Sequence, residues 1–178
     1  MSASVSIFNY VCLSLVLYLT LNGQNIAIQG ASNGSPLQAC VDMVPDHHVD
    51  AQTSASPFVA TPSVTSTTNG TDVKLTLATK SGSDLTFKGF LVIAFNHANQ
   101  TEGPIGTFSS VSDGQTINCP GVSANNAATH INSANKTSVT MDWTAPEGFV
   151  GTVLFKTTFA QNGGVFWVAT PSSLVNFV

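Results

Sequence analysis

Short segments in which hydrophobic and polar residues alternate recur along the chain, separated by clusters of Gly, Asn, Ser and Pro. The clearest segment spans 73–77, where valine and leucine alternate with Lys74 and Thr76. A period of two is typical of a strand with one face toward the core and the other toward solvent. The same alternation predicts further strands at 139–143 and 153–158.

Two other segments have strand character without a polar face. Within the segment 87–95, residues 90–95 are apolar on both faces, which predicts a central strand buried between two layers. Residues 165–169 predict a last strand, which Pro171 ends. The polar stretch 109–135 predicts long loops with one short strand. No hydrophobic period supports a helix of three turns.

The predicted strands define the fold class. The intervals between them are too short for crossover helices, so neighbouring strands are expected to be antiparallel. Roughly seven to nine short strands predict an all-β fold, an antiparallel two-sheet β-sandwich with an immunoglobulin-like arrangement. A chain of 178 residues is expected to form one domain, which we assign to residues 31–178.

The beginning of the chain has the pattern of a targeting segment. The apolar run 11–21 has the length of a secretory signal and is too short to span a bilayer. We assign residues 1–30 to a signal peptide and leader, with cleavage between about 23 and 30. The small polar segment 29–36 is expected to be mobile. Later apolar runs do not exceed strand length, so we predict a secreted, extracellular protein without membrane insertion.

The charge of the chain restricts its partners. Five basic residues, all lysine, stand against nine acidic residues, giving a formal net charge of −4. This balance argues against nucleic acid as a partner. The sequence also contains no basic amphipathic helix with which to attack an anionic membrane.

Two cysteines are expected in the secreted protein, because Cys12 lies inside the predicted signal. Cys40 and Cys119 are then an even number in an oxidising compartment, which predicts a disulfide between them. Closing a loop of this length stabilises the fold by roughly 4–5 kcal/mol in the chain-entropy treatment. The alternative is a pair of buried free thiols.

Asn-X-Ser/Thr sequons also favour secretion. Four of them lie in polar, turn-rich stretches and are candidate glycosylation sites: Asn33, Asn69, Asn99 and Asn135.

Two patterns that resemble catalytic motifs are interpreted as incidental. Residues 30–34 match the G-x-S-x-G nucleophile elbow, which requires a strained turn between a strand and a helix, but no predicted strand precedes them and no helix follows. Glu102 and Glu147 are the only glutamates and both lie in turns, without the placement across a cleft that a glycosidase needs. We therefore predict no catalytic residue and no enzymatic activity.

One cluster contains residues that bind metals in other proteins, namely Asp46, His47, His48 and Asp50. Adjacent histidines on a strand point apart, so a third ligand would have to come from His97 or His130. Nothing in the sequence brings either close to the cluster. We interpret these side chains as hydrogen-bonded loop residues and predict neither a metal nor a cofactor.

The two tryptophans are expected in different environments. Trp143 lies on the apolar side of its strand and is predicted to be core. The neighbours of Trp167, Phe166 and Val168, fall on the opposite face of their strand, so the indole is expected to be exposed. Trp167 is therefore the single candidate binding residue.

A series of short motifs along the chain resembles the reeler, or reelin-type, domain. From Leu37 to the last strand they occur in that family's order: Cys40-Val-Asp-Met43-Val-Pro45-Asp-His47, Ser56-Pro57-Phe58, Phe87-Lys-Gly89-Phe90-Leu91, Gly106-Thr-Phe108, Cys119, Thr129-His130, Trp143-Thr-Ala-Pro146 and Gly151-Thr-Val153-Leu-Phe155.

This resemblance implies a Cys40–Cys119 disulfide and a role in innate immunity. A lone reeler domain behind a signal peptide is similar to the insect "putative defense proteins", which respond to bacterial challenge and are linked to nodulation. The resemblance implies partners on microbial cell surfaces, such as glycolipids or glucans, and host blood cells. We expect a monomeric binder, and the resemblance assigns no binding residues.

Two other functions stay open at this point. The chain would act as an extracellular adhesion or matrix module if it bound host cells without induction by bacteria. A role accessory to redox or haem chemistry would require retained haem or metal in the purified protein. The redox alternative has the least support, because the chain lacks haem-ligation patterns.

Overall fold

The computed structural model describes residues 31–81 and 83–178. Within these residues the regular structure is eleven strands and two short 3-10 helices, η1 (Leu37–Cys40) and η2 (Gln100–Glu102). The all-β prediction is confirmed, although the strands outnumber the seven to nine that were expected. The predicted signal peptide and its cleavage region lie outside the described residues.

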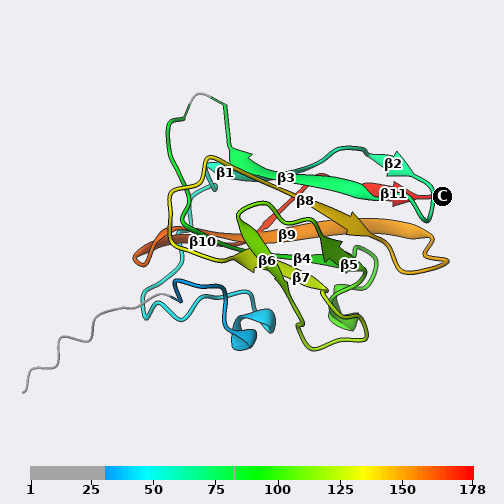
Figure 1. Ribbon diagram of the computed structural model, residues 1–178, viewed down its shortest axis with the longest axis horizontal. Helices are drawn as coiled ribbons and strands as arrows, with labels where there is room; N and C mark the ends of the chain where they lie inside the picture. The colour runs from blue at the N-terminus through cyan, green and yellow to red at the C-terminus, as the bar shows by residue number, and fades with distance from the viewer. Residues whose placement is uncertain (1–30, 82) are drawn as a thin grey trace, which may run out of the picture.

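The strands form two sheets packed face to face, with β3 and β8 in a layer above β4 and β9 (Figure 1). The smaller sheet has the order β1 (Phe58–Pro62), β3 (Val73–Thr79), β8 (Ser138–Thr144) and β5 (Thr107–Ser109). The larger sheet has the order β2 (Ser66–Thr67), β11 (Val175–Phe177), β9 (Gly151–Asn162), β4 (Gly89–Asn96), β7 (Ala127–His130) and β6 (Gly114–Ile117), and β10 (Val165–Pro171) also pairs with β9. All pairs are antiparallel except β2 with β11. The predicted β-sandwich is therefore confirmed, and it is immunoglobulin-like in outline.

Aromatic side chains fill the space between the sheets. Phe58 of β1 contacts Phe87 and Phe159 with 5.4 Å between ring centroids in each pair. Trp143 of β8 stands edge-on to Phe155 of β9 at 5.3 Å, and all five side chains are fully buried. The core position predicted for Trp143 is confirmed. Close packing of this kind makes the sandwich a rigid support for the segments outside it.

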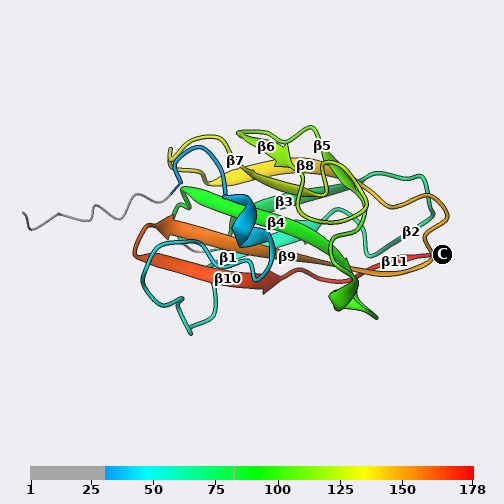
Figure 2. The same cartoon turned by 90° about the horizontal axis from the view of Figure 1, so that it is seen from below.

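The outer face of the larger sheet is also covered. Leu91 and Ile93 of β4 point away from the main core and pack against Ala39, Cys40 and Met43 of the N-terminal segment. Figure 2 shows η1 lying across β4 on this face. The segment predicted to be apolar on both faces is therefore buried on both faces, as expected.

The polar stretch 109–135 contains more structure than predicted. It holds two strands, β6 and β7, which pair with each other, and β7 continues the sheet beside β4. All four residues of β7 are buried, so its Ala-Ala-Thr-His sequence has no polar face from which alternation could be detected. The strand at 165–169 is confirmed as β10, but it is not the last strand, because β11 follows Pro171.

The predicted exposure of Trp167 is wrong. Its side chain is 8% exposed and stands edge-on to Phe58 at 5.6 Å between ring centroids. Its neighbour Phe166 is also buried, against His47 on the opposite face. Both faces of β10 are covered, and shifts of register interrupt its pairing with β9, so alternation does not report exposure there.

Candidate functional site

Residues 31–47 cross the outer face of the larger sheet and are attached to it by hydrogen bonds. The Ser35 amide donates to Thr129 Oγ1 at 2.9 Å, and Gln115 Nε2 donates to the Asn33 carbonyl at 2.8 Å. Residues 31–36, which the sequence predicted to be mobile, therefore lie against the sheet and bond to it. The hydrogen-bond partners of residues 31–36 come from Gln115 on β6 and Thr129 on β7, which are distant in sequence.

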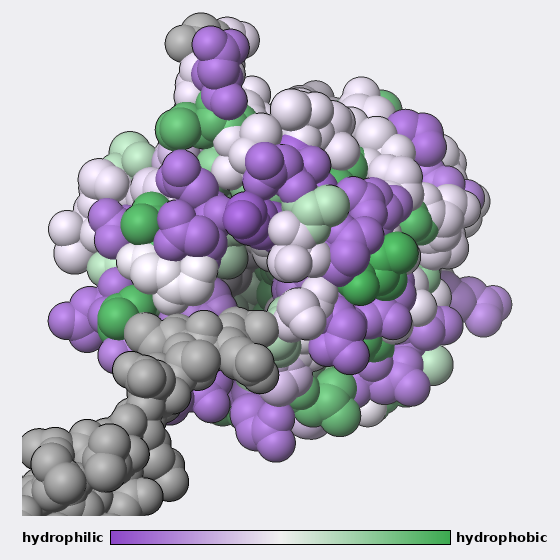
Figure 3. Space-filling view, turned by 60° about the vertical axis from the view of Figure 1, so that its left-hand side comes forward, coloured by the Kyte–Doolittle hydropathy of each residue, from purple (hydrophilic) through white to green (hydrophobic). Residues whose placement is uncertain are grey.

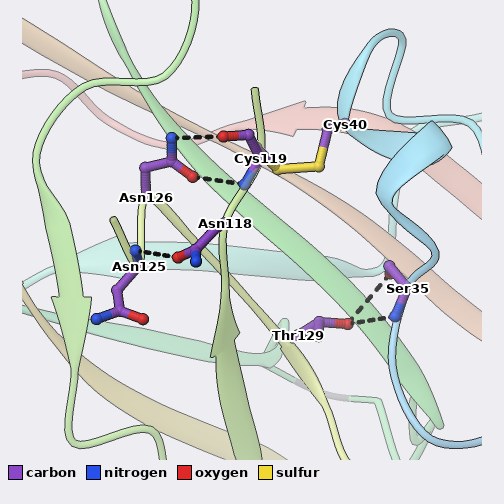
Figure 4. Close-up of a disulfide and its surroundings, with 7 residues drawn as sticks. All are labelled: Ser35, Cys40, Asn118, Cys119, Asn125, Asn126 and Thr129. Carbon is purple, nitrogen blue, oxygen red and sulfur yellow. Dashed lines mark hydrogen bonds between the residues drawn. A yellow bond between two sulfur atoms is a disulfide. The ribbon is translucent and has the colours of Figure 1, made fainter. Parts of the chain in front are cut away.

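The predicted disulfide between Cys40 and Cys119 is present and joins η1 to the loop after β6 (Figure 4). The buried Asn126 amide group orders that loop. Its Nδ2 donates to the Cys119 carbonyl at 3.0 Å, and its Oδ1 accepts from the Cys119 amide at 2.8 Å. Asn126 lies in an Asn-rich stretch that sequence analysis treated as loop, and no local signal marks it.

A pocket of about 490 Å³ opens where this segment crosses the ends of β4, β7 and β9, and the surface is hollowed at that end of the molecule (Figure 3). We call it the end pocket. Its lining comprises Ala31, Ser32, Ser35, Pro36, Pro45, Asp46, His47, Lys88, Gly89, Phe90, Leu91, His130, Ser133, Thr158, Ala160, Asn162 and Gly163. Volumes of this order are typical of small-ligand sites.

Small side chains on the sheet leave room for the pocket. Gly89 lies on the same outer face as Leu91, and a Cβ added there would come within 3.2 Å of His130 Cε1 and 3.4 Å of Ala160 Cβ. Farther along β4, Leu91 and Ile93 are covered by η1. The hollow therefore begins beyond η1, where the side chains on the sheet become small.

His130 connects the sheet to the beginning of the segment. Its Nδ1 accepts a hydrogen bond from the Phe90 amide at 3.2 Å, which leaves the proton on Nε2. The Nε2 atom lies 2.9 Å from the Ala31 carbonyl, to which it donates. The ring is 8% exposed and bonded at both nitrogens, so it acts as a wall of the pocket.

His47 forms part of the opposite wall. Its ring is also 8% exposed and stands edge-on to Phe166 at 5.2 Å, with Nδ1 buried and without a hydrogen-bond partner. Burial lowers the pKa of His47, the Asp46 carboxylate opposes this shift, and His130 and His48 reinforce it. His47 and His130 line the same pocket, which sequence spacing did not reveal.

The remaining candidate metal ligands do not join them. His48 is exposed and lies 3.4 Å from the Asp46 carboxylate, while Asp50 and His97 are exposed and do not line the end pocket. Among residues 31–81 and 83–178, no three His, Cys, Asp or Glu side chains are grouped so as to hold a metal ion.

Lys136 is a buried cation that sequence analysis missed. Its Nζ donates to the backbone carbonyls of Asn132, Ala134 and Lys88 at 3.0–3.2 Å and to Asn132 Oδ1 at 2.9 Å. The Asp113 carboxylate lies 3.5 Å away. Lys136 thereby ties the β7–β8 loop, which carries Ser133 of the pocket, to the beginning of β4. In the sequence, Lys136 is marked only as the middle residue of the sequon at Asn135, which gives no sign of its burial.

The candidate glycosylation sites differ in their environment. Asn33, Asn99 and Asn135 are exposed. The Asn69 side chain is half-buried, and its amide donates to the carbonyls of Pro146 and Phe149 at 2.9 and 3.2 Å. Asn69 therefore links two turns of the sandwich.

The motifs interpreted as incidental are not assembled into a catalytic arrangement. Ser32 lies in a turn that leads into η1 and lines the end pocket. Glu102 is part of η2, and Glu147 lies in the turn between β8 and β9, with both side chains exposed. In the part of the chain that the structure covers, no helix has the length and apolar character needed to cross a membrane.

The family profile and the similar proteins point to the same family. Residues 38–178 match the profile of the Reeler domain. The "Putative defense protein" of Bombyx mori is 35% identical over 178 residues, which cover 95% of this chain and 98% of that protein. The "Putative ferric-chelate reductase 1" of Danio rerio is 35% identical over 150 residues, 83% of this chain but only 25% of that protein.

Solved structures agree on the fold. The crystal structure of the human F-spondin reeler domain superposes with a TM-score of 0.59 at 20% sequence identity, covering 72% of this chain and 94% of that one. The family profile, the full-length relative and this fold agree with the motifs that run from Cys40 to Phe155. The chain belongs to the Reeler domain family.

Proposed function

We propose that this chain is a secreted defense protein that binds microbial surfaces through the end pocket and promotes clearance such as nodulation. The observation that carries the proposal is the end pocket itself, about 490 Å³ in volume, with rigid strands beneath it and loops around it. Binding sites on loops above a rigid sheet are a common arrangement. The name of the Bombyx mori relative, "Putative defense protein", supports the defense role.

Two further features support this proposal. A disulfide that closes a long loop is typical of proteins made in an oxidising compartment, which agrees with secretion. Both ring nitrogens of His130 are bonded to backbone groups, so this histidine is not available as a general base in the pocket. Binding without catalysis is the function that this arrangement favours.

The test is to measure the fraction of purified secreted protein that binds to Gram-positive bacteria, Gram-negative bacteria and yeast. Ala160→Leu places a larger side chain on the floor of the pocket, at a position outside the main core. Ala78→Leu makes the same change on a half-buried site of β3, in the other sheet. We expect Ala160→Leu to reduce binding and Ala78→Leu to leave it unchanged. Equal binding by both variants would contradict the proposal.

A further inference from the structure

We infer that the end pocket takes the fatty-acyl chain of an amphipathic lipid, with the polar head of that lipid at the rim. This inference rests on the proposed function and narrows its ligand. Of the two ligand classes that the resemblance implies, it selects acylated molecules such as glycolipids over glucans. It depends on how the polar groups of the pocket are already engaged.

Two polar side chains in the interior of the pocket, Thr158 and His130, are fully hydrogen-bonded within the protein. Thr158 Oγ1 donates to the Met43 carbonyl at 2.7 Å and accepts from the Ala169 amide at 3.1 Å. Ser35 Oγ and Thr129 Oγ1 are hydrogen-bonded to each other at 3.1 Å. Because His130 is likewise bonded at both nitrogens, Thr158 and His130 present carbon to a ligand.

His47 lines the same interior with its imidazole ring. Its Nδ1 is shielded from solvent inside the wall, where it has no partner, and the ring packs against Phe166. The rest of the interior is apolar, with Leu91 and Ala160 on the sheet and Pro36 and Pro45 on the crossing segment.

A glucan fits such an interior poorly. Each sugar hydroxyl that enters it leaves water without gaining a hydrogen-bond partner, and burial of an unpaired polar group is unfavourable. An alkyl chain has no such requirement, and its transfer from water to a carbon-lined pocket is favourable in proportion to the area buried.

The rim has the opposite character. Lys88, Asp46, Ser133 and Asn162 line the pocket and are all exposed. The rim therefore carries one cation, one anion and neutral polar groups, which together suit a head group that remains in water. An apolar interior beneath a polar rim matches the two ends of an amphipathic lipid.

The first experiment measures the affinity of the secreted protein for hexanoate, octanoate, decanoate and dodecanoate by calorimetry. Burial of one methylene contributes a factor of about four in affinity. We expect affinity to rise by about this factor per added methylene until the pocket is full, and then to level off. Affinity that does not change with chain length would overturn the inference.

A second set of probes tests whether the pocket recognises the alkyl chain or the head group of the ligand. Dodecyl glucoside, a lysophosphocholine and dodecanoate share an alkyl chain and differ in the head group, whereas β-glucan oligosaccharides have no chain. Binding of the three amphiphiles, without binding of the oligosaccharides, is the expected result. Lys88→Ala should lower the affinity for dodecanoate more than the affinity for dodecyl glucoside. It should leave the dependence of affinity on alkyl-chain length unchanged.

Variants connect the probes to the pocket. Ala160→Leu should lower the affinity for every acyl probe by about tenfold or more, and Ala78→Leu should not change these affinities. If Ala160→Leu fails to fold, Ser133→Trp blocks the mouth of the pocket from an exposed loop instead.

Failure of the inference is distinguishable from failure of the proposed function. Oligosaccharides that bind in an Ala160-dependent manner would overturn the acyl inference and leave microbial binding intact. Microbial binding that is insensitive to both pocket variants would overturn the proposed function as well.

Discussion

Replacing Cys40 and Cys119 with alanine removes the covalent link between the N-terminal segment and the larger sheet. The two residues are separated by 79 positions. For a loop of this length the chain-entropy relation gives a loss of roughly 4.5 kcal/mol in the free energy of unfolding at 25 °C. Ala39 and Met43 still pack on Leu91 and Ile93 in the variant, so the loss arises mainly from the unfolded chain.

Urea unfolding followed by tryptophan fluorescence is a suitable assay, because Trp143 and Trp167 are both buried in the core. We expect a lower midpoint and a larger dependence of the free energy on urea, since the unfolded chain without the disulfide exposes more surface. The wild type in dithiothreitol should unfold like the double variant. A loss below about 1 kcal/mol would refute the reasoning, because it would place the constraint of the disulfide far below the chain-entropy value.

Three further predictions follow from individual side chains and from the overall charge. Lys136→Met should lower the free energy of unfolding by about 3 kcal/mol, since three part-buried carbonyls lose their donor at the lower end of about 1–3 kcal/mol each, whereas the exposed Lys80→Met should not change the urea midpoint. Burial lowers the pKa of His47 in the folded protein, so the unfolded chain binds a proton first as the pH falls below the ordinary value of 6.5. Stability should therefore be complete above that pH and fall below it, and His47→Phe should flatten this dependence in urea titrations at successive pH values. Binding to bacteria should change little between low and high salt, without dye leakage from liposomes of bacterial lipids, because a chain with net charge −4 gains little attraction to anionic surfaces; loss of binding at moderate salt would contradict this.

The strands that sequence analysis identified are those whose environment leaves a local pattern. β3 and β8 each have one buried and one less buried face, so alternation along 73–77 and 139–143 reports their structure directly. The apolar run of β4 reports burial on both faces. Because these signals depend only on neighbouring residues, they can be detected before any tertiary contact is known.

Elements that the fold covers from outside leave no such pattern. In β7, Thr129 is buried because it bonds to Ser35, and His130 because it bonds to Phe90 and Ala31, all distant in sequence. Trp167 is likewise buried by β1, a strand that no local signal connects with β10.

The sequence by itself determined the all-β class, the family and the partners of the disulfide, since only two cysteines remain outside the predicted signal. Only the tertiary structure decided where the end pocket lies. One pocket is lined by His47, Gly89, His130 and Ala160 for two reasons. The sheet order places β4 between β7 and β9, and the N-terminal segment, held by the disulfide at Cys40, crosses the ends of these strands. Sheet order and the path of a covering segment are set by contacts between residues far apart in the chain, which local periodicity does not encode.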